Sequence, residues 1–178
     1  MKAFIFLVLI VGIVSCSSQS TDDILAQLEQ LETELDSMST NNENAEIKDF
    51  AAIRLWSTDI NGQIRRISKP VSFEIGNAIS RFNLLRKSLM PYDSLNVRLT
   101  NEIDSAKVNI QLLKDDINNS AGTEYLYEDY VTHERNNVKQ ISVLVERRDS
   151  MAVIIKDVHQ ELFPTLELNL SEYIDAPN

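Results

Sequence analysis

The chain has 178 residues, a formal net charge of −10 and a sequence pI of about 4.7. Nucleic acid and anionic lipid attract clusters of Lys and Arg, so a chain this acidic is not expected to bind nucleic acid or to use a basic membrane-binding patch. Only four Gly and four Pro occur, which is few for a protein rich in strands or loops, and one helical domain is the expectation.

The first residues have the pattern of an export signal. Lys2 provides a positive start, and an apolar run from Phe4 to Val14 follows it. The run is shorter than the about 20 apolar residues that a membrane-spanning helix needs. A basic start, a short apolar run and then a small residue, Ser15, are typical of a secretory signal peptide. We therefore predict that residues 1–15 are a signal peptide.

The next motif concerns the single cysteine. Ile13-Val14-Ser15-Cys16 resembles the lipobox of bacterial lipoproteins. The resemblance implies that the Cys16 sulfur receives diacylglycerol, that a peptidase cuts before it, and that the new amine is acylated, usually with palmitate. Two or three acyl chains would hold the protein on a membrane, at about 0.8 kcal/mol for each buried CH2. The alternative is an ordinary cleaved signal or an uncleaved anchor, with Cys16 incidental.

The residues after Cys16 bear on which membrane holds the protein. An aspartate directly after the cysteine resembles an inner-membrane retention signal of some Gram-negative bacteria, whereas Ser17 and Ser18 stand here. We therefore expect a lipid-anchored protein of the cell envelope, at the outer membrane rather than the inner one; a Gram-positive source is the alternative. Residues 16–22 are expected to form a short tether.

A first helix is predicted from Ser20, whose hydroxyl can cap it, with Asp22 and Asp23 in the first turn. Its apolar residues recur at spacings of four and three, which is typical of a coiled-coil seam: they are Ile24, Leu28, Leu31, Leu35 and Met38. The polar run at 39–42 predicts its end.

A second helix is predicted over residues 43–69. Its apolar stripe comprises Ile47, Phe50, Ile53, Trp56, Ile60, Ile64 and Ile67. Asn61-Gly62 is a common turn pair, but the stripe stays in phase across it. Lys69-Pro70 is the better boundary, because proline disfavours helical geometry in the residue before it.

Two long helices follow. The first is predicted from Val71 to Asn119 with a kink at Pro91, and Gly122 suits the turn after it. The second is predicted over 123–163 and is stopped by Pro164. The short link between them makes these helices antiparallel.

The predicted fold is therefore all-α. We expect an elongated antiparallel helical bundle, or coiled-coil-like hairpin, of three to four helices over residues 23–163, with a C-terminal tail at 164–178. The tail alternates like a strand but can equally form a short helix that uses Leu166, Leu170 and Tyr173.

The sequence offers no recognisable catalytic site, metal site or cofactor site. His133 and His159 lie 26 residues apart on one predicted helix, about 39 Å, and cannot share a metal ion. Lipid on Cys16 would leave no thiol nucleophile, and the chain has no glycine-rich phosphate loop. We predict a protein that is not an enzyme and that binds no cofactor and no metal.

Aromatic residues are the candidates for an interaction surface, because they carry much of the binding energy at interfaces. Tyr125, Tyr127 and Tyr130 are spaced by two and three, so they cannot all face one core. Core packing is favoured for Trp56 and Tyr130, and for Tyr125 and Tyr127 both interpretations stay open. The candidates for the surface are thus Tyr125, Tyr127 and Trp56.

A repeated triplet suggests a modification. Four Asp-Ser-apolar triplets resemble the Asp-Ser/Thr-apolar site at which some Gram-negative bacteria O-glycosylate exported proteins. The resemblance implies four possible sites: Ser37, Ser94, Ser105 and Ser150. The alternative is that these are plain serines of a helix surface.

The resulting functional prediction is a membrane-anchored lipoprotein of the cell envelope that acts as a helical protein–protein interaction, spacer or adaptor module. Its partners would be the membrane, through lipid on Cys16, and an envelope protein or a second copy of the chain. The alternative is a tethered small-ligand-binding or sensor bundle, since bundles can hold ligands between their helices.

Overall fold

The fold is all-α, as predicted. The computed structural model describes residues 20–46, 49–119 and 124–174, with side chains except at 41–49 and 124–126. Its elements are α1 (Thr21–Glu46), α2 (Asp49–Ile64), α3 (Phe73–Asn118), α4 (Glu124–Asn169) and the short 3-10 helix η1 (Leu170–Tyr173). The described part holds no strand, only an isolated bridge between Ile67 and Ile174.

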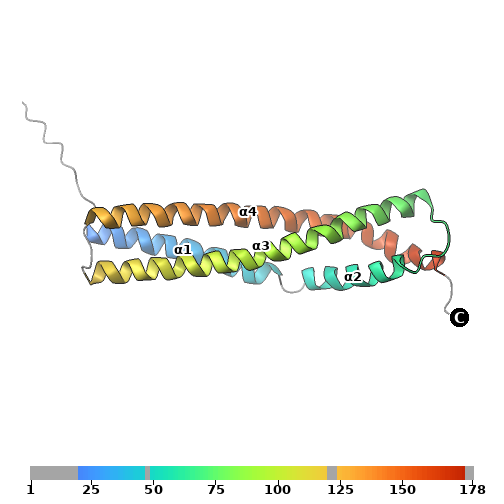
Figure 1. Ribbon diagram of the computed structural model, residues 1–178, viewed down its shortest axis with the longest axis horizontal. Coiled ribbons are helices and arrows are strands. Elements are labelled where there is room, and N and C mark those ends of the chain that lie inside the picture. The colour runs from blue at the N-terminus through green and yellow to red at the C-terminus, as the bar shows by residue number, and fades with distance from the viewer. Residues whose placement is uncertain (1–19, 47–48, 120–123, 175–178) are drawn as a thin grey trace, which may run out of the picture.

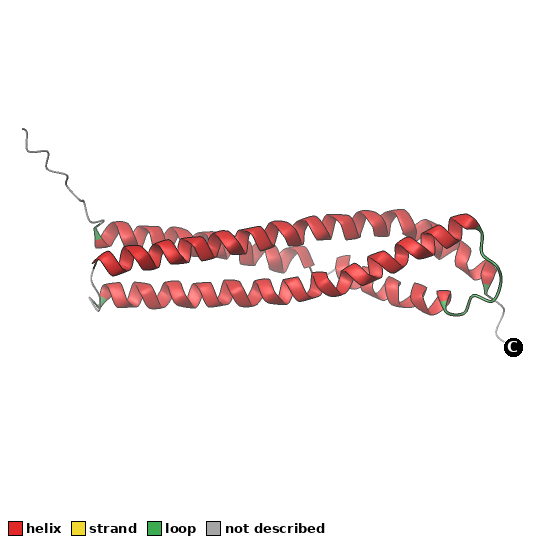
Figure 2. Ribbon diagram, turned by 45° about the horizontal axis from the view of Figure 1, so that its top comes forward, coloured by secondary structure: helices red, strands yellow, loops and turns green. Residues whose placement is uncertain are grey.

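The molecule is a rod. Figure 1 shows α3 and α4 side by side along its length, with α1 and α2 following one another along the same pair. Figure 2 shows the same arrangement from a second direction. The 46 residues of α3 correspond to a length of about 69 Å. The predicted elongated bundle is confirmed as three helices at any one level, because α1 and α2 share the third position.

A heptad pattern in α3 explains why it lies flat along its partner. Its buried residues alternate at spacings of three and four over almost the whole helix, which keeps them on one face. They are Ile75, Ala78, Phe82, Leu85, Leu89, Tyr92, Asn96, Leu99, Ile103, Ala106, Ile110, Leu113 and Ile117. Helix α4 carries a matching seam from Tyr127 to Leu166.

The core is divided into two clusters. One joins α1 to the C-terminal part of α3 and the N-terminal part of α4; the other joins α2 to the remaining parts of α3 and α4 and to η1. We call the α1 half of the rod α1 with residues 97–118 and 124–147, and the α2 half residues 49–96 and 148–173. Every buried member of both clusters lies between Ile24 and Leu170.

A polar layer separates the clusters. Asn96 of α3 and Arg148 of α4 are 5% and 1% exposed, and neither belongs to a cluster. Asn96 occupies a heptad position that isoleucine fills at 103 and 110. Near this level Phe50, at the start of α2, stacks on Tyr92 with 4.3 Å between the ring centres. The polar layer therefore lies where α1 gives way to α2.

Ion pairs between helices are consistent with one register. In the α1 half, Lys107 Nζ lies 2.7 Å from Asp36 Oδ1 and Lys114 Nζ lies 2.9 Å from Glu32 Oε2. The α1 partner moves back as the α3 partner moves forward, so α1 and α3 are antiparallel. In the α2 half Arg54 pairs with Asp93, and Arg81 pairs with Glu161.

Two predicted boundaries near the α1–α2 junction are wrong. Helix α1 runs on to Glu46, through the polar run that was expected to end it, and the Thr40 hydroxyl donates to the Asp36 carbonyl within it. Such residues lower helix propensity by only about 0.7 kcal/mol each, which is too little to end a helix. Helix α2 spans Asp49–Ile64 instead of 43–69. It ends soon after Asn61-Gly62, so that pair marks its last turn.

The prolines do not end their helices. Pro91 lies inside α3, as predicted, but Pro164 also lies inside α4, which continues to Asn169. A proline costs about 3 kcal/mol in a helix interior, whereas burying a leucine contributes about 1.5–3 kcal/mol. Leu166 and Leu170 are both fully buried beyond Pro164. The helical alternative for the tail is therefore the correct one, and its residues belong to the core.

Candidate functional site

Cys16 lies outside the described residues, but the structure shows where the chain leaves the rod after it. The Asp23 amide donates to Ser20 Oγ at 3.2 Å, which caps α1 as the sequence predicts. Helix α1 then begins at Thr21. Figure 1 shows this end of α1 at the same tip as the end of α3 and the start of α4, and the C-terminus near the opposite tip. Lipid on Cys16 would attach close to one tip.

The described part of the chain was searched for membrane spans and metal sites. None of its helices is both long enough and apolar enough to cross a bilayer. No three of its His, Cys, Asp or Glu side chains come together as a metal site would require. His133 is exposed, and His159 is half-buried.

Trp56 belongs to the core and not to an interaction surface. It is 9% exposed and meets Phe82 and His159 edge to face, with ring centres 5.5 and 4.6 Å apart. The His159 Nε2 atom and the Trp56 Nε1 atom are buried without a hydrogen-bond partner among the described residues. Burial lowers the pKa of His159 below its usual value.

The structure reverses the expected roles of two tyrosines. Tyr127 is 6% exposed, and its hydroxyl donates to the Asp116 carbonyl at 3.1 Å, whereas Tyr130 is 55% exposed. Tyr127 lies on the seam four residues before Val131, which puts Tyr130 on the flank. The side chain of Tyr125 lies outside the described ones. Extending the seam back from Val131 and Val138 could have found this assignment.

The four serines of the Asp-Ser-apolar triplets are all exposed: they are Ser37 on α1, Ser94 and Ser105 on α3, and Ser150 on α4. Ser94 and Ser105 lie 11 residues apart, which is about three turns, so they share a face of α3. The Ser150 hydroxyl donates to the Glu146 carbonyl at 2.9 Å. Their exposure fits both interpretations, and modification stays a prediction.

Two open hollows lie between α3 and α4. One, near Tyr130, has a volume of about 210 Å³ and is lined by Asn109, Leu112, Leu113, Asp116, Tyr127, Tyr130 and Glu134. The other, about 140 Å³, is lined by Arg81, Leu84, Leu85, Ser88, Ile154, Ile155 and Val158. Because no residue of α1 or α2 lines either hollow, both open on the face of the rod away from those helices.

A buried carboxylate distinguishes the hollow near Tyr130. Glu134 is 7% exposed although it occupies a seam position of α4, where Ile141 stands one heptad later. Asn137 donates to Glu134 Oε2 at 3.4 Å, which is long for such a bond. Asp116 lines the same hollow. The hollow thus combines leucine and tyrosine surface with two carboxylates.

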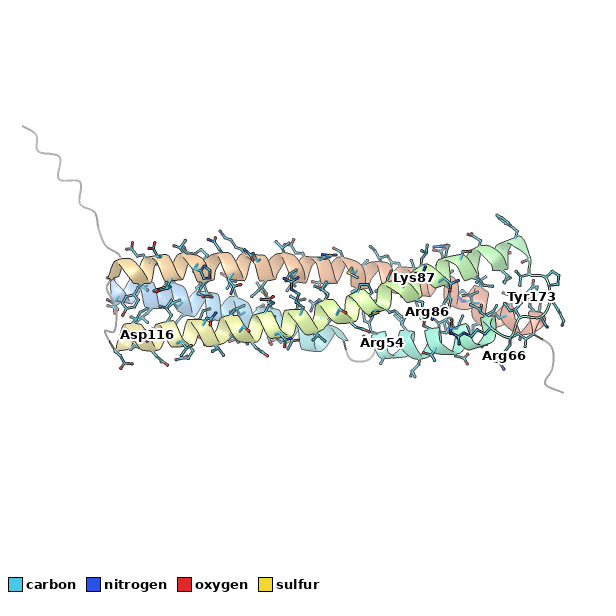
Figure 3. The ribbon with its side chains drawn as sticks, in the orientation of Figure 1. Arg54, Arg66, Arg86, Lys87, Asp116 and Tyr173 are labelled. Atoms are coloured by element: carbon cyan, nitrogen blue, oxygen red, sulfur yellow. The ribbon has the colours of Figure 1, made fainter. Side chains whose placement is uncertain are left out.

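Charge is divided unevenly along the rod. The α1 half carries 17 Asp and Glu against 6 Lys and Arg, whereas the α2 half carries 9 of each. Figure 3 shows Asp116 near the tip where α1 begins, and Arg54, Arg66, Arg86 and Lys87 in the other half. Nearly all of the net negative charge therefore lies in the half that is nearer to Cys16.

A third hollow, of about 310 Å³, lies between α2 and α4 and is lined by Ala52, Ile53, Lys156, His159 and Gln160. It combines apolar side chains with a cation and an imidazole.

Comparison with known proteins gives no further assignment: no protein family matches the chain, and no curated protein or solved structure is detectably similar to it.

Proposed function

We propose that the protein is a lipid-anchored rod of a bacterial cell envelope, which acts by protein–protein contact as a spacer or adaptor and not as an enzyme. The observation that carries the proposal is the position of the two chain ends at opposite tips of one long bundle (Figure 1). A lipid anchor on Cys16 at one tip leaves the other tip up to about 69 Å away, the length of α3.

The packing supports a rigid rod. Helices α3 and α4 are continuous across both core clusters, and ion pairs join α1 to α3 and α2 to α3. At the far tip, the Ser68 amide donates to the Tyr173 carbonyl at 3.1 Å, which ties the α2–α3 link to the C-terminal end. Both tips are thus tied to the same two long helices, as a spacer requires.

The anchor is tested by labelling cells with an alkyne analogue of palmitate, in a Gram-negative host that expresses the full chain. We expect label on the natural chain and none on Cys16→Ala. The matched control is Ser18→Ala, which changes a residue two positions away and should keep the label. Unchanged labelling of Cys16→Ala would refute the anchor.

The hollow at His159 favours a second function, the small-ligand-binding bundle. Its Lys156 and His159 would suit a small anion with an apolar part. Native mass spectrometry of the protein purified from its envelope checks this function: a bound molecule that is lost in Lys156→Ala supports it, and the bare mass of the chain counts against it.

A further inference from the structure

The two hollows between α3 and α4 are parts of one groove. On α3, Arg81, Leu84, Leu85 and Ser88 in one hollow are repeated 28 residues later by Asn109, Leu112, Leu113 and Asp116 in the other. On α4, Tyr127 and Tyr130 are repeated by Ile155 and Val158 at the same distance. Since 28 residues are four heptads, equivalent positions of the same helix faces line both hollows.

Apolar side chains continue between the hollows. Leu95 of α3 and Leu144 and Met151 of α4 are half-buried and pack against the core clusters. Leu84, Leu112 and Ile154 are 65%, 58% and 60% exposed at the groove. A helical spacing of about 1.5 Å per residue gives about 42 Å between the hollows. This length and this periodicity suit a single helix.

The charge at the groove selects among possible occupants. At the end nearer Cys16 the groove holds Asp116 and the buried Glu134, within a half that has 17 acidic and 6 basic residues. Arg98, on the groove side of α3, is paired with Glu102. Two copies anchored in one membrane would bring two α1 halves side by side, and their like charges would repel. A basic partner meets no such repulsion.

We propose that this groove binds an amphipathic helix of a partner protein, with an apolar stripe facing the hollows and Lys or Arg beside Asp116 and Glu134. The lysine or arginine stem would lie on Tyr130 and Leu112, whose exposed surface is apolar, while its charge reaches the carboxylates. The proposal refines the proposed adaptor function by naming its contact surface. It can be tested apart from the anchor, because binding is measured in solution without lipid.

The test uses the chain from Ser17 onward, which keeps every buried core residue. Two synthetic helical peptides of about 28 residues carry the same leucine heptads, with flanks of Lys in the basic probe and Glu in the acidic probe. Fluorescence anisotropy should give the basic probe an affinity at least about tenfold higher, a preference that salt weakens. Equal affinities, or no binding of either probe, would overturn the proposal.

Neighbouring residues provide matched controls for the site. Asp116 lines the hollow, whereas Asp115 is equally exposed on α3 but accepts a bond from Gln111 instead. Asp116→Lys should weaken binding of the basic probe about tenfold, and Asp115→Lys by less than about twofold. Equal losses would show general attraction to an acidic protein and would contradict a groove site.

The apolar contribution is tested in the same way. Leu112 lines the hollow and Val108 does not, although both are 58% exposed on α3. Leu112→Ser should weaken binding about fivefold and Val108→Ser should leave it unchanged. Circular dichroism confirms that each variant is folded. If sedimentation shows that the chain forms dimers which Leu112→Ser abolishes, the groove belongs to a second copy and the proposal is wrong.

Discussion

The imidazole of His159 lies in an environment that favours its neutral form. It packs against Trp56 and Phe163, with ring centres 4.6 and 5.6 Å away, and burial lowers its pKa. In the unfolded chain a histidine takes up a proton as the pH falls through about 6.5. The folded chain takes it up only at lower pH, so protonation favours the unfolded state below about pH 6.5.

We therefore expect the Tm of the chain from Ser17 to fall between pH 7.5 and pH 5.5, and to fall less in His159→Gln. The exposed His133 provides the control, since His133→Gln should keep the fall of the natural sequence. Thermal unfolding followed by circular dichroism measures both variants. A pH dependence that His133→Gln removes as well would contradict this assignment.

Tyr127 and Tyr130 form a second pair for comparison. Tyr127→Phe removes the bond to the Asp116 carbonyl and leaves a buried oxygen without it, which should cost about 1 kcal/mol. Tyr130→Phe alters an exposed hydroxyl and should cost less than about 0.5 kcal/mol. Urea unfolding gives both free energies of unfolding, and equal losses would show that the tyrosine packing described here is wrong.

At the scale of the helices, the polar layer allows a similarly matched test. Arg148 is buried at a seam position, whereas its neighbour Arg147 is exposed. Arg148→Ala removes a large side chain and its charge-assisted bonds from the core and should lower the free energy of unfolding by about 3 kcal/mol. Arg147→Ala should change it by less than about 0.5 kcal/mol. Urea unfolding at neutral pH compares them, and a tolerant position 148 would contradict a packed polar layer.

The sequence predicts the helices better than their ends. The seams of α3 and α4 are visible as apolar residues at spacings of three and four, so the hairpin follows from the pattern. The ends of α1 and α4 do not, because the polar run at 39–42 and Pro164 are local signals. Burial of Leu166 and Leu170 outweighs the proline. That burial depends on packing between helices, which no local signal records.

The candidate site was less predictable for the same reason. Heptad phase separates Tyr127 from Tyr130, but only once the seam has been fixed from Val131 onward. The groove depends on which faces α1 and α2 leave uncovered, and therefore on how α1 and α2 share one position of the bundle. The sequence gives no measure of that sharing, since α2 was expected to be a separate full member.

At the scale of the molecule, charge and anchor together set an orientation. Screening limits electrostatic effects to about 8 Å from a membrane surface at physiological salt. A rod lying flat on anionic lipid would bring much of its acidic α1 half within that distance, whereas an upright rod brings only one tip. Repulsion therefore favours the upright rod on anionic membranes, and high salt should weaken this preference.

The most direct test of the account measures the height of each tip above a membrane. The acylated full chain is placed in anionic vesicles with acceptor-labelled lipid, and a donor dye is attached to Asp129→Cys or to Leu168→Cys. These positions lie 39 residues apart on α4, about 58 Å. We predict strong energy transfer from position 129 and weak transfer from position 168, both lost in Cys16→Ala. Equal transfer from the two positions, or transfer that does not depend on Cys16, would contradict an upright rod anchored at one tip.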